Sequence, residues 1–368
     1  MKVGVPKETT AGERRVGLVP DGVTKLAAAG LQISVQAGAG AEAFFTDEAY
    51  QKAGATLVPD ARALFSAADA VLKLHAPSLE EVSWMHAEAI SISFLQPSSN
   101  AEVVKALARQ RVTAFSLELV PRISRAQSMD ALSSQAGVSG YKSVLMAANR
   151  LGKFFPLLIT AAGTVTPARV LVLGAGVAGL QAIATARRLG AVVSAYDTRA
   201  VVKEQVQSLG ATFLEIDLGA DAEGAGGYAK ELTPEQIAKQ RQFMVDHIGA
   251  SDVVITTALV PGRPAPLLIT EEAVAAMAPG SVIVDLAAEA GGNCALTTAD
   301  QTVVTPNGVH IIGRTNLPAT MPQHASQLYS RNVQALLDAL VKDGALVLDP
   351  ADEIARGTTI VRNGEVVK

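Results

Sequence analysis

The 368-residue chain contains one cysteine, few aromatic residues and little net charge. The single cysteine, Cys294, excludes an intrachain disulfide and a cysteine-based zinc site, and it favours a reducing compartment. We expect no other metal site. Aromatic residues make up only 4% of the chain, so we expect cores built mainly from alanine, valine and leucine. A net charge of −4 gives no reason to expect a nucleic-acid partner.

The sequence also lacks an uninterrupted hydrophobic run of membrane length. Residues 154–186 carry a single charge, Arg169, but Gly163, Pro167 and three later glycines break the run. The first eight residues contain no apolar segment of the kind found in signal peptides. We therefore expect a soluble chain.

A glycine motif follows a short apolar run, Val170–Leu173, that is typical of a parallel strand buried on both faces. Gly174, Gly176 and Gly179 form Gly-x-Gly-x-x-Gly, and helix-forming residues follow. The first glycine permits a tight turn, the second lets a pyrophosphate approach the backbone, and the third allows close helix–strand packing. The residues expected to line the cofactor here are Gly174, Gly176, Val177, Ala178 and Gly179.

A second strand, Val192–Tyr196, ends at an acid, Asp197. A carboxylate at this place accepts the hydroxyl protons of the adenosine ribose and repels a 2′-phosphate, so the pattern predicts NAD(H) rather than NADP(H). The alternative, a glycine-rich packing turn without a ligand, does not account for the ordered series of strand, turn, helix, strand and acid. Arg199 is the local counter-evidence, because an arginine can accommodate a 2′-phosphate. We expect Arg199 to lie over the adenine or to point into solvent.

A polar stretch, residues 118–130, follows the end of another expected strand, where open α/β sheets place ligands. It contains two arginines, Arg122 and Arg125, together with Gln127 and Asp130, and then leads into a long helix from about Ala131. The alternative is a polar loop with Asp130 as helix N-cap, which explains Asp130 alone. The spacing does not indicate what these side chains bind.

Two further stretches are expected near a nucleotide. Residues 218–232 hold several glycines and one aromatic residue, Tyr228, and this composition predicts either a loop anchored by Tyr228 or a plain flexible loop. Two buried strands end in small or polar residues, at Thr256-Thr257-Ala258 and after Asp285, and we expect them to form the far wall of the cleft.

The alternation of strands and helices predicts an α/β fold with two Rossmann-like, doubly wound parallel-sheet domains and a nucleotide cleft between them. We expect the first domain to be discontinuous, with residues 1–132 and 325–368, and the NAD(H)-binding domain to span residues 133–324. Residues 159–167 are expected to lead into the motif strand, and residues 326–341 to form a closing helix.

These motifs resemble, over essentially the full length, the NAD(H)-binding component (domain I) of proton-translocating nicotinamide nucleotide transhydrogenases. The resemblance rests on residues 121–130, 174–186 and 226–231. It implies that the nicotinamide is held by Arg122, Gln127, Asp130 and Ser133, that Tyr228 lies on a mobile loop closing over the nucleotide, and that Asp197 takes the adenosine ribose. Thr257 and Ala258 complete the expected cofactor-binding set.

The resemblance also implies a multi-subunit assembly. It predicts a homodimer, a separate NADP(H)-binding component, and a membrane-spanning subunit that conducts protons. NADP(H) would then bind only on the partner component. The expected location is the cytoplasm, at the inner face of a bacterial plasma membrane and held there through the partner subunits.

Two alternatives remain. The parent superfamily contains alanine dehydrogenase, whose chemistry needs a general acid/base and a cation for a carboxylate. Arg15 and Lys73 stand where that enzyme's substrate-binding residues are expected, but Phe94-Leu-Gln96 replaces the expected catalytic histidine. The other alternative is a non-catalytic NAD sensor, which only activity with a partner would separate from a transhydrogenase subunit.

Overall fold

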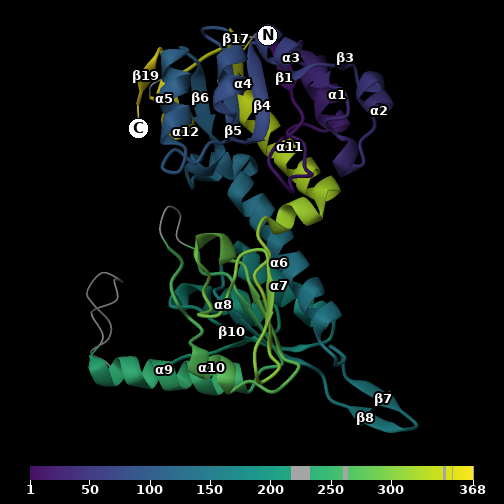
Figure 1. Ribbon diagram of the computed structural model, residues 1–368, viewed down its shortest axis with the longest axis vertical. Helices are drawn as coiled ribbons and strands as arrows, with labels where there is room; N and C mark the ends of the chain where they lie inside the picture. The colour runs from purple at the N-terminus through teal and green to yellow at the C-terminus, as the bar shows by residue number, and fades with distance from the viewer. Residues whose placement is uncertain (217–232, 260–263, 343–344, 350, 368) are drawn as a thin grey trace. The chain divides into compact units, whose positions relative to one another are not determined.

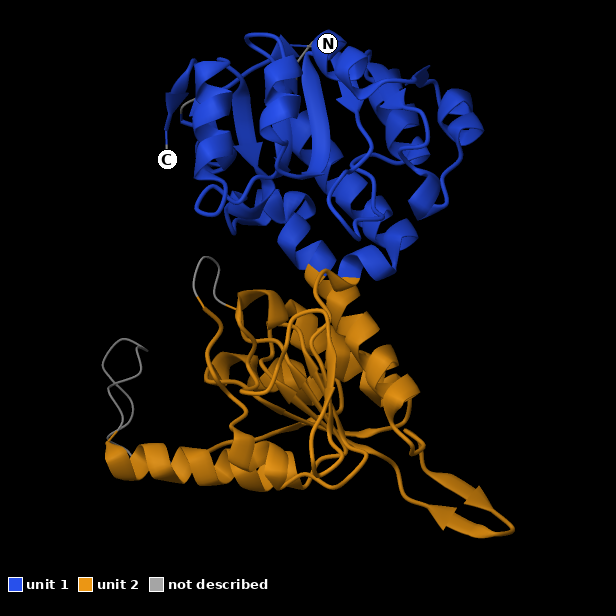
Figure 2. Cartoon of the chain, viewed as in Figure 1, with its two compact units in different colours: residues 1–135, 318–368 blue, residues 136–317 orange. Residues whose placement is uncertain are grey.

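The computed structural model describes residues 1–216, 233–259, 264–342, 345–349 and 351–367 (Figure 1). The chain forms two compact units (Figure 2): unit 1 comprises Met1–Gln135 and Pro318–Lys368, and unit 2 comprises Ala136–Leu317. Helix α6 (Ala131–Arg150) carries the chain from unit 1 into unit 2. Unit 1 is therefore discontinuous in sequence.

Unit 1 is built on an eight-stranded sheet in the order β19-β18-β6-β5-β4-β1-β2-β3. The strands from β6 to β3 are parallel, and β18 and β19 extend the β6 edge in antiparallel pairing. The central strand β4 is buried along nearly its whole length, as expected where helices cover both faces. The strands are β1 (Lys2–Val5), β2 (Gln32–Gln36), β3 (Thr56–Val58), β4 (Ala70–His75), β5 (Ile90–Phe94), β6 (Thr113–Ser116), β18 (Thr359–Arg362) and β19 (Glu365–Val366).

Several helices of unit 1 begin at clear capping residues. Thr46 caps α2 by accepting a hydrogen bond from the Ala49 amide, and Ser78 and Glu81 form a reciprocal capping box at α4. A small antiparallel pair, β16 (Val341–Lys342) and β17 (Ala345–Leu346), follows α11. The helices are α1 (Pro20–Ala28), α2 (Asp47–Lys52), α3 (Ala61–Ala67), α4 (Leu79–Trp84), α5 (Ala101–Arg109), α11 (Pro322–Leu340) and α12 (Glu353–Thr358), with 3₁₀ turns η1 (Ala41–Ala43), η2 (Leu117–Leu119) and η3 (Ser124–Met129).

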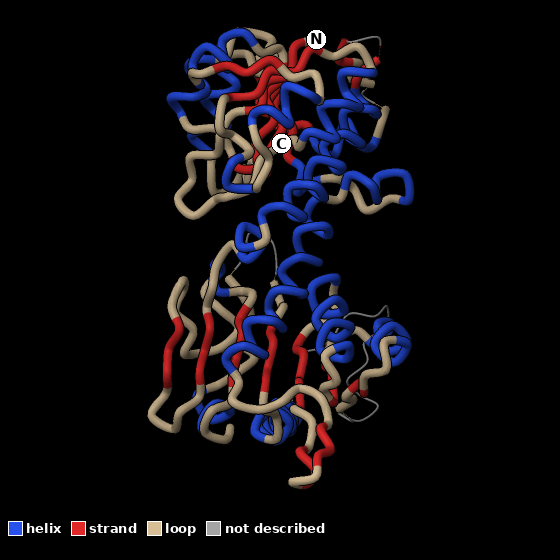
Figure 3. Tube along the Cα trace, turned by 90° about the vertical axis from the view of Figure 1, so that its right-hand side faces the viewer, coloured by secondary structure: helices blue, strands red, loops and turns tan. Residues whose placement is uncertain are grey.

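Unit 2 contains a seven-stranded sheet in the order β11-β10-β9-β12-β13-β15-β14, and its strands lie side by side in Figure 3. Six of these strands are parallel, and the edge strand β14 pairs with β15 in antiparallel fashion. The strands are β9 (Arg169–Leu173), β10 (Val192–Tyr196), β11 (Thr212–Phe213), β12 (Val253–Thr256), β13 (Val282–Asp285), β14 (Thr302–Val304) and β15 (His310–Ile312). The helices are α7 (Val177–Arg188), α8 (Lys203–Ser208), α9 (Pro234–Gly249) and α10 (Glu271–Ala275), with short 3₁₀ turns η4 (Ala200–Val202) and η6 (Ala288–Ala290). The 3₁₀ turn η7 (Leu317–Thr320) lies where the chain passes from unit 2 back to unit 1.

Both units share one strand order. Counted along the chain, the parallel strands run 3-2-1-4-5-6 in each sheet, so the winding reverses between β1 and β4 in unit 1 and between β9 and β12 in unit 2. Such reversal points, at the carboxyl ends of the strands, are where open α/β sheets bind ligands. The predicted fold class of two doubly wound, mainly parallel sheets is confirmed.

Two local features differ from what the sequence indicates. The stretch that leads into β9 contains a two-stranded hairpin that the sequence did not predict, β7 (Leu158–Thr160) and β8 (Gly163–Val165). Its turn, Ala161-Ala162, lacks the Asn-Gly or Asp-Gly signal by which short hairpins are found in a sequence. The closing helix α11 begins at Pro322, four residues before the expected start, because proline is well suited to a first helical turn.

Within the described ranges, no helix combines the length and apolarity needed to cross a bilayer. Two aromatic side chains of unit 1, Tyr50 and Tyr329, are fully buried in its core.

Candidate functional site

The glycine turn lies at the reversal point of unit 2, between β9 and α7. Gly174 has φ +100°, a conformation that favours glycine, and its amide donates to the Tyr196 carbonyl oxygen at 2.8 Å. A Cβ on Gly179 would lie 1.9 Å from the Gly174 oxygen, so only glycine fits there. A Cβ on Gly176, in contrast, would meet nothing within 4 Å. The turn is therefore closely packed at its first and third glycines and open at its second.

Gly176 is also the N-cap of α7 and provides no capping side chain. Val177 is about half exposed and Ala178 follows it in the first helical turn. Amides at a helix N-terminus point outward and carry a partial positive charge, which suits an anion such as a pyrophosphate. Helix α6 packs closely against this end of α7: a Cβ on Gly140 would lie 2.1 Å from the Ala178 oxygen.

Asp197 follows β10, beside the glycine turn. Its Oδ2 accepts a hydrogen bond from the Ala175 amide at 2.7 Å, which ties the acid to the turn itself. Its side chain is almost completely buried. Burial acts to raise the pKa of Asp197. Hydrogen bonds from the Arg199 side chain and from the Ala175 and Arg199 amides act in the opposite direction and outweigh burial, so the pKa of Asp197 lies below its usual value. The carboxylate is thus ionised at neutral pH.

The Arg199 side chain pairs with Asp197, a contact that the sequence did not predict: Nε lies 3.0 Å from Asp197 Oδ1 and Nη2 lies 2.9 Å from Oδ2. A planar guanidinium two residues away can bind both oxygens of a carboxylate at once. The Arg199 amide also donates to Oδ1 at 2.9 Å. More than half of the Arg199 side chain remains exposed.

The next strand end, after β12, supplies Thr257 and Ala258. The Thr257 hydroxyl donates to the Gly174 oxygen at 3.1 Å, so this strand end holds the glycine turn in place. Ala258 is bound on both sides by Asn293: its amide donates to Asn293 Oδ1 at 3.1 Å, and its oxygen accepts from Nδ2 at 2.8 Å. Asn293 was not singled out in the sequence. The one signal for it is its place directly after Gly291-Gly292, in the segment that follows β13.

In unit 1, the predicted nicotinamide residues lie just before η3 (Arg122), on η3 (Gln127) and at the start of α6 (Asp130 and Ser133). Ala126 and Met129 are buried and anchor η3, whereas Arg122 and Gln127 are exposed. Asp130 accepts from the Ser133 amide at 2.8 Å and from the Ser133 hydroxyl at 2.6 Å. Asp130 therefore caps α6, and Asp130 and Ser133, two of the four residues predicted to hold the nicotinamide, are in direct contact.

Arg125, from the same stretch, has a structural partner. Its two terminal nitrogens lie 3.0 and 2.7 Å from the two carboxylate oxygens of Asp352, which also caps α12. The hydrogen bonds from Arg125 lower the pKa of Asp352 to about 2. This ion pair fastens η3 to α12 and so fixes the segment that presents Arg122 and Gln127.

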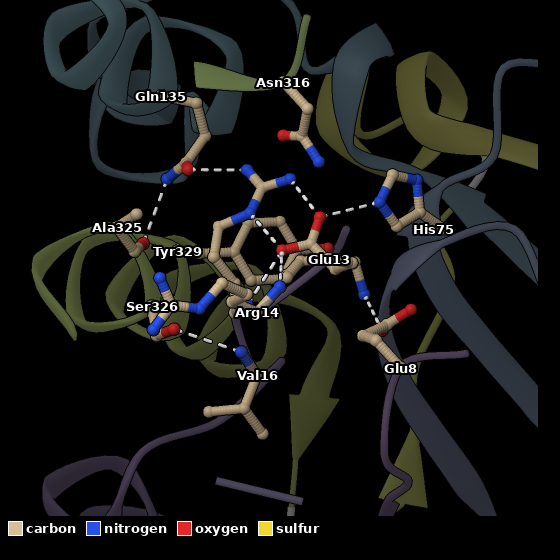
Figure 4. Close-up of polar contacts among 12 residues, drawn as sticks. Glu8, Glu13, Arg14, Val16, His75, Gln135, Asn316, Ala325, Ser326 and Tyr329 are labelled. Atoms are coloured by element: carbon tan, nitrogen blue, oxygen red, sulfur yellow. Dashed lines mark hydrogen bonds and ion pairs between the residues drawn. The ribbon is translucent and has the colours of Figure 1, made fainter. Parts of the chain in front are cut away.

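A charged cluster fills the reversal point of unit 1 (Figure 4). Arg15 donates to Glu13 at 2.8 and 2.6 Å, and it donates to Gln135 at 2.8 Å. His75 reaches the same Glu13 at 2.8 Å. Glu13, Arg15 and Gln135 are buried, so the ends of β1 and β4 are occupied here by the protein's own ion pairs rather than by a glycine turn.

Lys73 lies in a neighbouring buried group. Its Nζ is 2.9 Å from Glu81 and 3.7 Å from Glu8, and all three side chains are almost completely inaccessible. Burial raises the pKa of Glu8, although the Lys73 ammonium opposes the shift. Both cations that an alanine dehydrogenase function requires, Arg15 and Lys73, are thus buried and already paired with carboxylates.

Tyr228 and the rest of the predicted glycine-rich loop, from residue 218 to residue 232, lie outside the described residues. Across the described ranges, no group of three or more histidine, cysteine, aspartate or glutamate side chains is placed to hold a metal ion.

Two domain families match the chain almost end to end. The alanine dehydrogenase/PNT N-terminal domain matches residues 4–139, and the alanine dehydrogenase/PNT C-terminal domain matches residues 143–368. The chain is 48% identical over 376 residues to the first polypeptide of NAD(P) transhydrogenase subunit alpha from Rhodospirillum rubrum, and the match covers 100% of this chain and 98% of that protein.

Two solved structures from the same group of proteins are similar to this chain over its whole length. The crystal structure of transhydrogenase from Sinorhizobium meliloti is similar with a TM-score of 0.88 and 41% identity, and the match covers 100% of this chain and 99% of that chain. An L-alanine dehydrogenase is similar with a TM-score of 0.82 and 28% identity, over 100% of this chain and 97% of that chain.

Proposed function

Because the chain belongs to the alanine dehydrogenase/PNT family, we propose that it is the NAD(H)-binding alpha subunit of a proton-translocating NAD(P) transhydrogenase. The observation that carries this proposal is the 48% identity to the Rhodospirillum rubrum subunit over the whole of this chain. Identity to the L-alanine dehydrogenase structure is much lower, at 28%. The family resemblance inferred from the sequence motifs is confirmed.

The proposed NAD(H) site lies at the reversal point of unit 2. The pyrophosphate would rest on the open face of Gly176, against the first amides of α7 at Val177 and Ala178. The adenosine ribose would bind Asp197, whose ionised carboxylate repels a 2′-phosphate. To do so, the ribose must displace the Arg199 guanidinium from at least one carboxylate oxygen.

The nicotinamide would be held by Arg122, Gln127, Asp130 and Ser133. Two of these, Arg122 and Gln127, present exposed donors on a segment that η3 packing and the Arg125–Asp352 pair keep in place. The Asp130–Ser133 pair fixes the beginning of α6 and offers a hydroxyl and a carboxylate at one point. An arginine, a glutamine amide and a serine hydroxyl together suit the carboxamide of the ring.

The proposed chemistry is direct hydride transfer between C4 of NADH and C4 of NADP+. NADP(H) would be bound on a separate component. Because a hydride carries its electron pair with it, this step needs no general acid from the chain. The residues of the proposed site would orient the ring and exclude water.

The assembly proposed with this function has three components: a homodimer of this chain, an NADP(H)-binding component, and a membrane-spanning subunit that translocates protons. Hydride transfer would be coupled to proton movement through these partners. The chain would then lie in the cytoplasm, held at the inner face of a bacterial plasma membrane by the other subunits.

Reconstitution tests the proposal. The chain is mixed with an NADP(H)-binding transhydrogenase component, and reduction of NADP+ by NADH is followed. We expect exchange with both components present and none with either alone. The isolated chain should not reduce NAD+ with alanine. Alanine turnover by the isolated chain would instead establish the alanine dehydrogenase function, despite the buried, paired Arg15 and Lys73.

A further inference from the structure

Asp285, the last residue of β13, is fully buried and accepts five hydrogen bonds from neutral donors. Its Oδ1 accepts from the Thr256 hydroxyl and the Ala287 amide, both at 2.9 Å. Its Oδ2 accepts from the Asn293 amide at 2.7 Å, the Cys294 amide at 3.0 Å and the Thr297 hydroxyl at 2.6 Å. These five donors are all uncharged, so dipoles compensate the burial of this carboxylate.

The Asp285 carboxylate determines the path of the backbone after β13. Gly292 has φ +88°, and a Cβ there would lie 2.8 Å from Asp285 Oδ2. The backbone is thus drawn tightly around the acid, which places the Asn293 side chain toward β12. Asn293 is itself fully buried, and its Nδ2 also donates to the Pro266 oxygen at 2.8 Å.

From Asn293 the contacts continue to the proposed cofactor turn. Asn293 binds both backbone polar groups of Ala258. The preceding residue, Thr257, donates its hydroxyl to Gly174. An unbroken series of short contacts therefore leads from Asp285 through Asn293, Ala258 and Thr257 to the glycine turn.

We propose that Asp285, acting through Asn293, is a positioning residue for hydride transfer: it sets the β12 strand end and the glycine turn against the bound NAD(H). This inference rests on the proposed function. Because Asn293 binds both the amide and the oxygen of Ala258, Ala258 is held in one position and its amide hydrogen is not left to donate to the nucleotide. Such a rigid wall matters most for the placement of the reacting ring.

A matched pair of asparagine variants tests the proposal. Asn293→Ala removes the link to Ala258. Asn307→Ala is the control. Asn307 lies between β14 and β15 of the same sheet, and its side-chain amide donates to the Val274 oxygen at 3.1 Å and to the Met277 oxygen at 3.2 Å. The variant therefore also removes hydrogen bonds from an asparagine side chain to the backbone, but away from the glycine turn. Both changes should lower the melting temperature. Only Asn293→Ala should slow hydride transfer at saturating NADH, by about tenfold or more if the wall shifts by a fraction of an ångström.

A second pair of variants leaves both Asp285 and Asn293 unchanged. Thr256→Val deletes the hydroxyl that binds Asp285, whereas Thr256→Ser keeps it. We expect Thr256→Val to slow hydride transfer, as Asn293→Ala does. The Thr256→Ser variant should transfer hydride at a rate near that of the wild type. This rescue separates positioning from a general loss of stability.

The measurements are the melting temperature, the NADH dissociation constant and the transfer rate at saturating NADH, all on the full chain with the NADP(H)-binding component. Folded Asn293→Ala and Thr256→Val chains that transfer hydride as fast as Asn307→Ala would overturn the inference while leaving the proposed function intact. A wild-type chain that transfers no hydride would overturn both.

Discussion

Arg199 and Asp197 form a two-point ion pair at the end of β10, with both carboxylate oxygens within 3.0 Å of a guanidinium nitrogen. The carboxylate also accepts from the Ala175 and Arg199 amides. A carboxylate offers about four acceptor positions, so a ribose bound at Asp197, as proposed, would compete with the arginine for this acid. Under this proposal, the affinity for the nucleotide depends on Arg199.

Arg199→Ala should therefore tighten NADH binding. More than half of the Arg199 side chain is exposed, and exposed ion pairs contribute about 0.2–1 kcal/mol, which corresponds to a gain of up to about fivefold. Added salt should tighten NADH binding to the wild type more than to the variant, because it weakens the same pair. Arg241→Ala, which breaks an exposed pair with Glu272 in the same unit, is the control and should leave affinity unchanged. Weaker NADH binding by Arg199→Ala would show that the arginine itself contacts the nucleotide.

Asp197→Asn should reduce the preference for NADH over NADPH. The variant loses the charge that repels a 2′-phosphate and leaves Arg199 free to bind one. Loss of hydrogen bonds to a charged acceptor costs on the order of 1–3 kcal/mol of NADH affinity. Titrations of both nucleotides measure the ratio. Equal affinities of the wild type for NADH and NADPH would contradict the assignment of Asp197 to the ribose.

Arg122→Ala and Gln127→Ala should act mainly on rate. The adenosine and pyrophosphate contacts supply most of the binding, whereas the orientation of the nicotinamide matters chiefly in the transition state. We expect NADH dissociation constants within severalfold of the wild type and hydride transfer slower by on the order of a hundredfold. Ser124→Ala, at an exposed neighbour on η3, is the matched control. If Arg122→Ala lost affinity and rate by the same factor, the ring-orienting role would be wrong.

Arg125→Ala should remove a pH-dependent contribution to the stability of unit 1. Its guanidinium lowers the folded-state pKa of Asp352 to about 2, below an unfolded value of about 3.9. A depressed carboxylate pKa stabilises the fold fully above the unfolded value, and the contribution is lost as pH falls from about 4 towards 2. The difference in unfolding free energy between wild type and variant should therefore be constant from about pH 5 to 7 and shrink in acid. A difference that does not change with pH would exclude this pair as its source.

The nucleotide turn was predictable because its requirements are local. Gly174 needs a positive φ, Gly179 needs the absence of a Cβ, and Asp197 follows directly on the next strand, so each leaves a mark in the sequence. The doubly wound order follows in the same way from the alternation of buried strands and helices. The η3 segment was expected only as a loop, because buried Ala126 and Met129 among polar neighbours give too short a pattern to mark a helix.

Other features depend on residues far apart in sequence. Asn293 binds Ala258, 35 residues away, and Arg125 binds Asp352, 227 residues away. Nothing in either local sequence indicates such a partner. The direction of Arg199 is a different case: its partner is two residues away, but an exposed arginine has many rotamers, and only the geometry of the strand end selects among them.

The most direct test of direct hydride transfer uses NADH carrying deuterium in both positions at C4. The chain is mixed with the NADP(H)-binding component and NADP+, and the product NADPH is analysed by mass spectrometry and NMR. Direct transfer between the two rings predicts one deuterium per NADPH, at C4, with no dilution by hydrogen from water. NADPH without deuterium, or with hydrogen taken from the solvent, would contradict the proposed function.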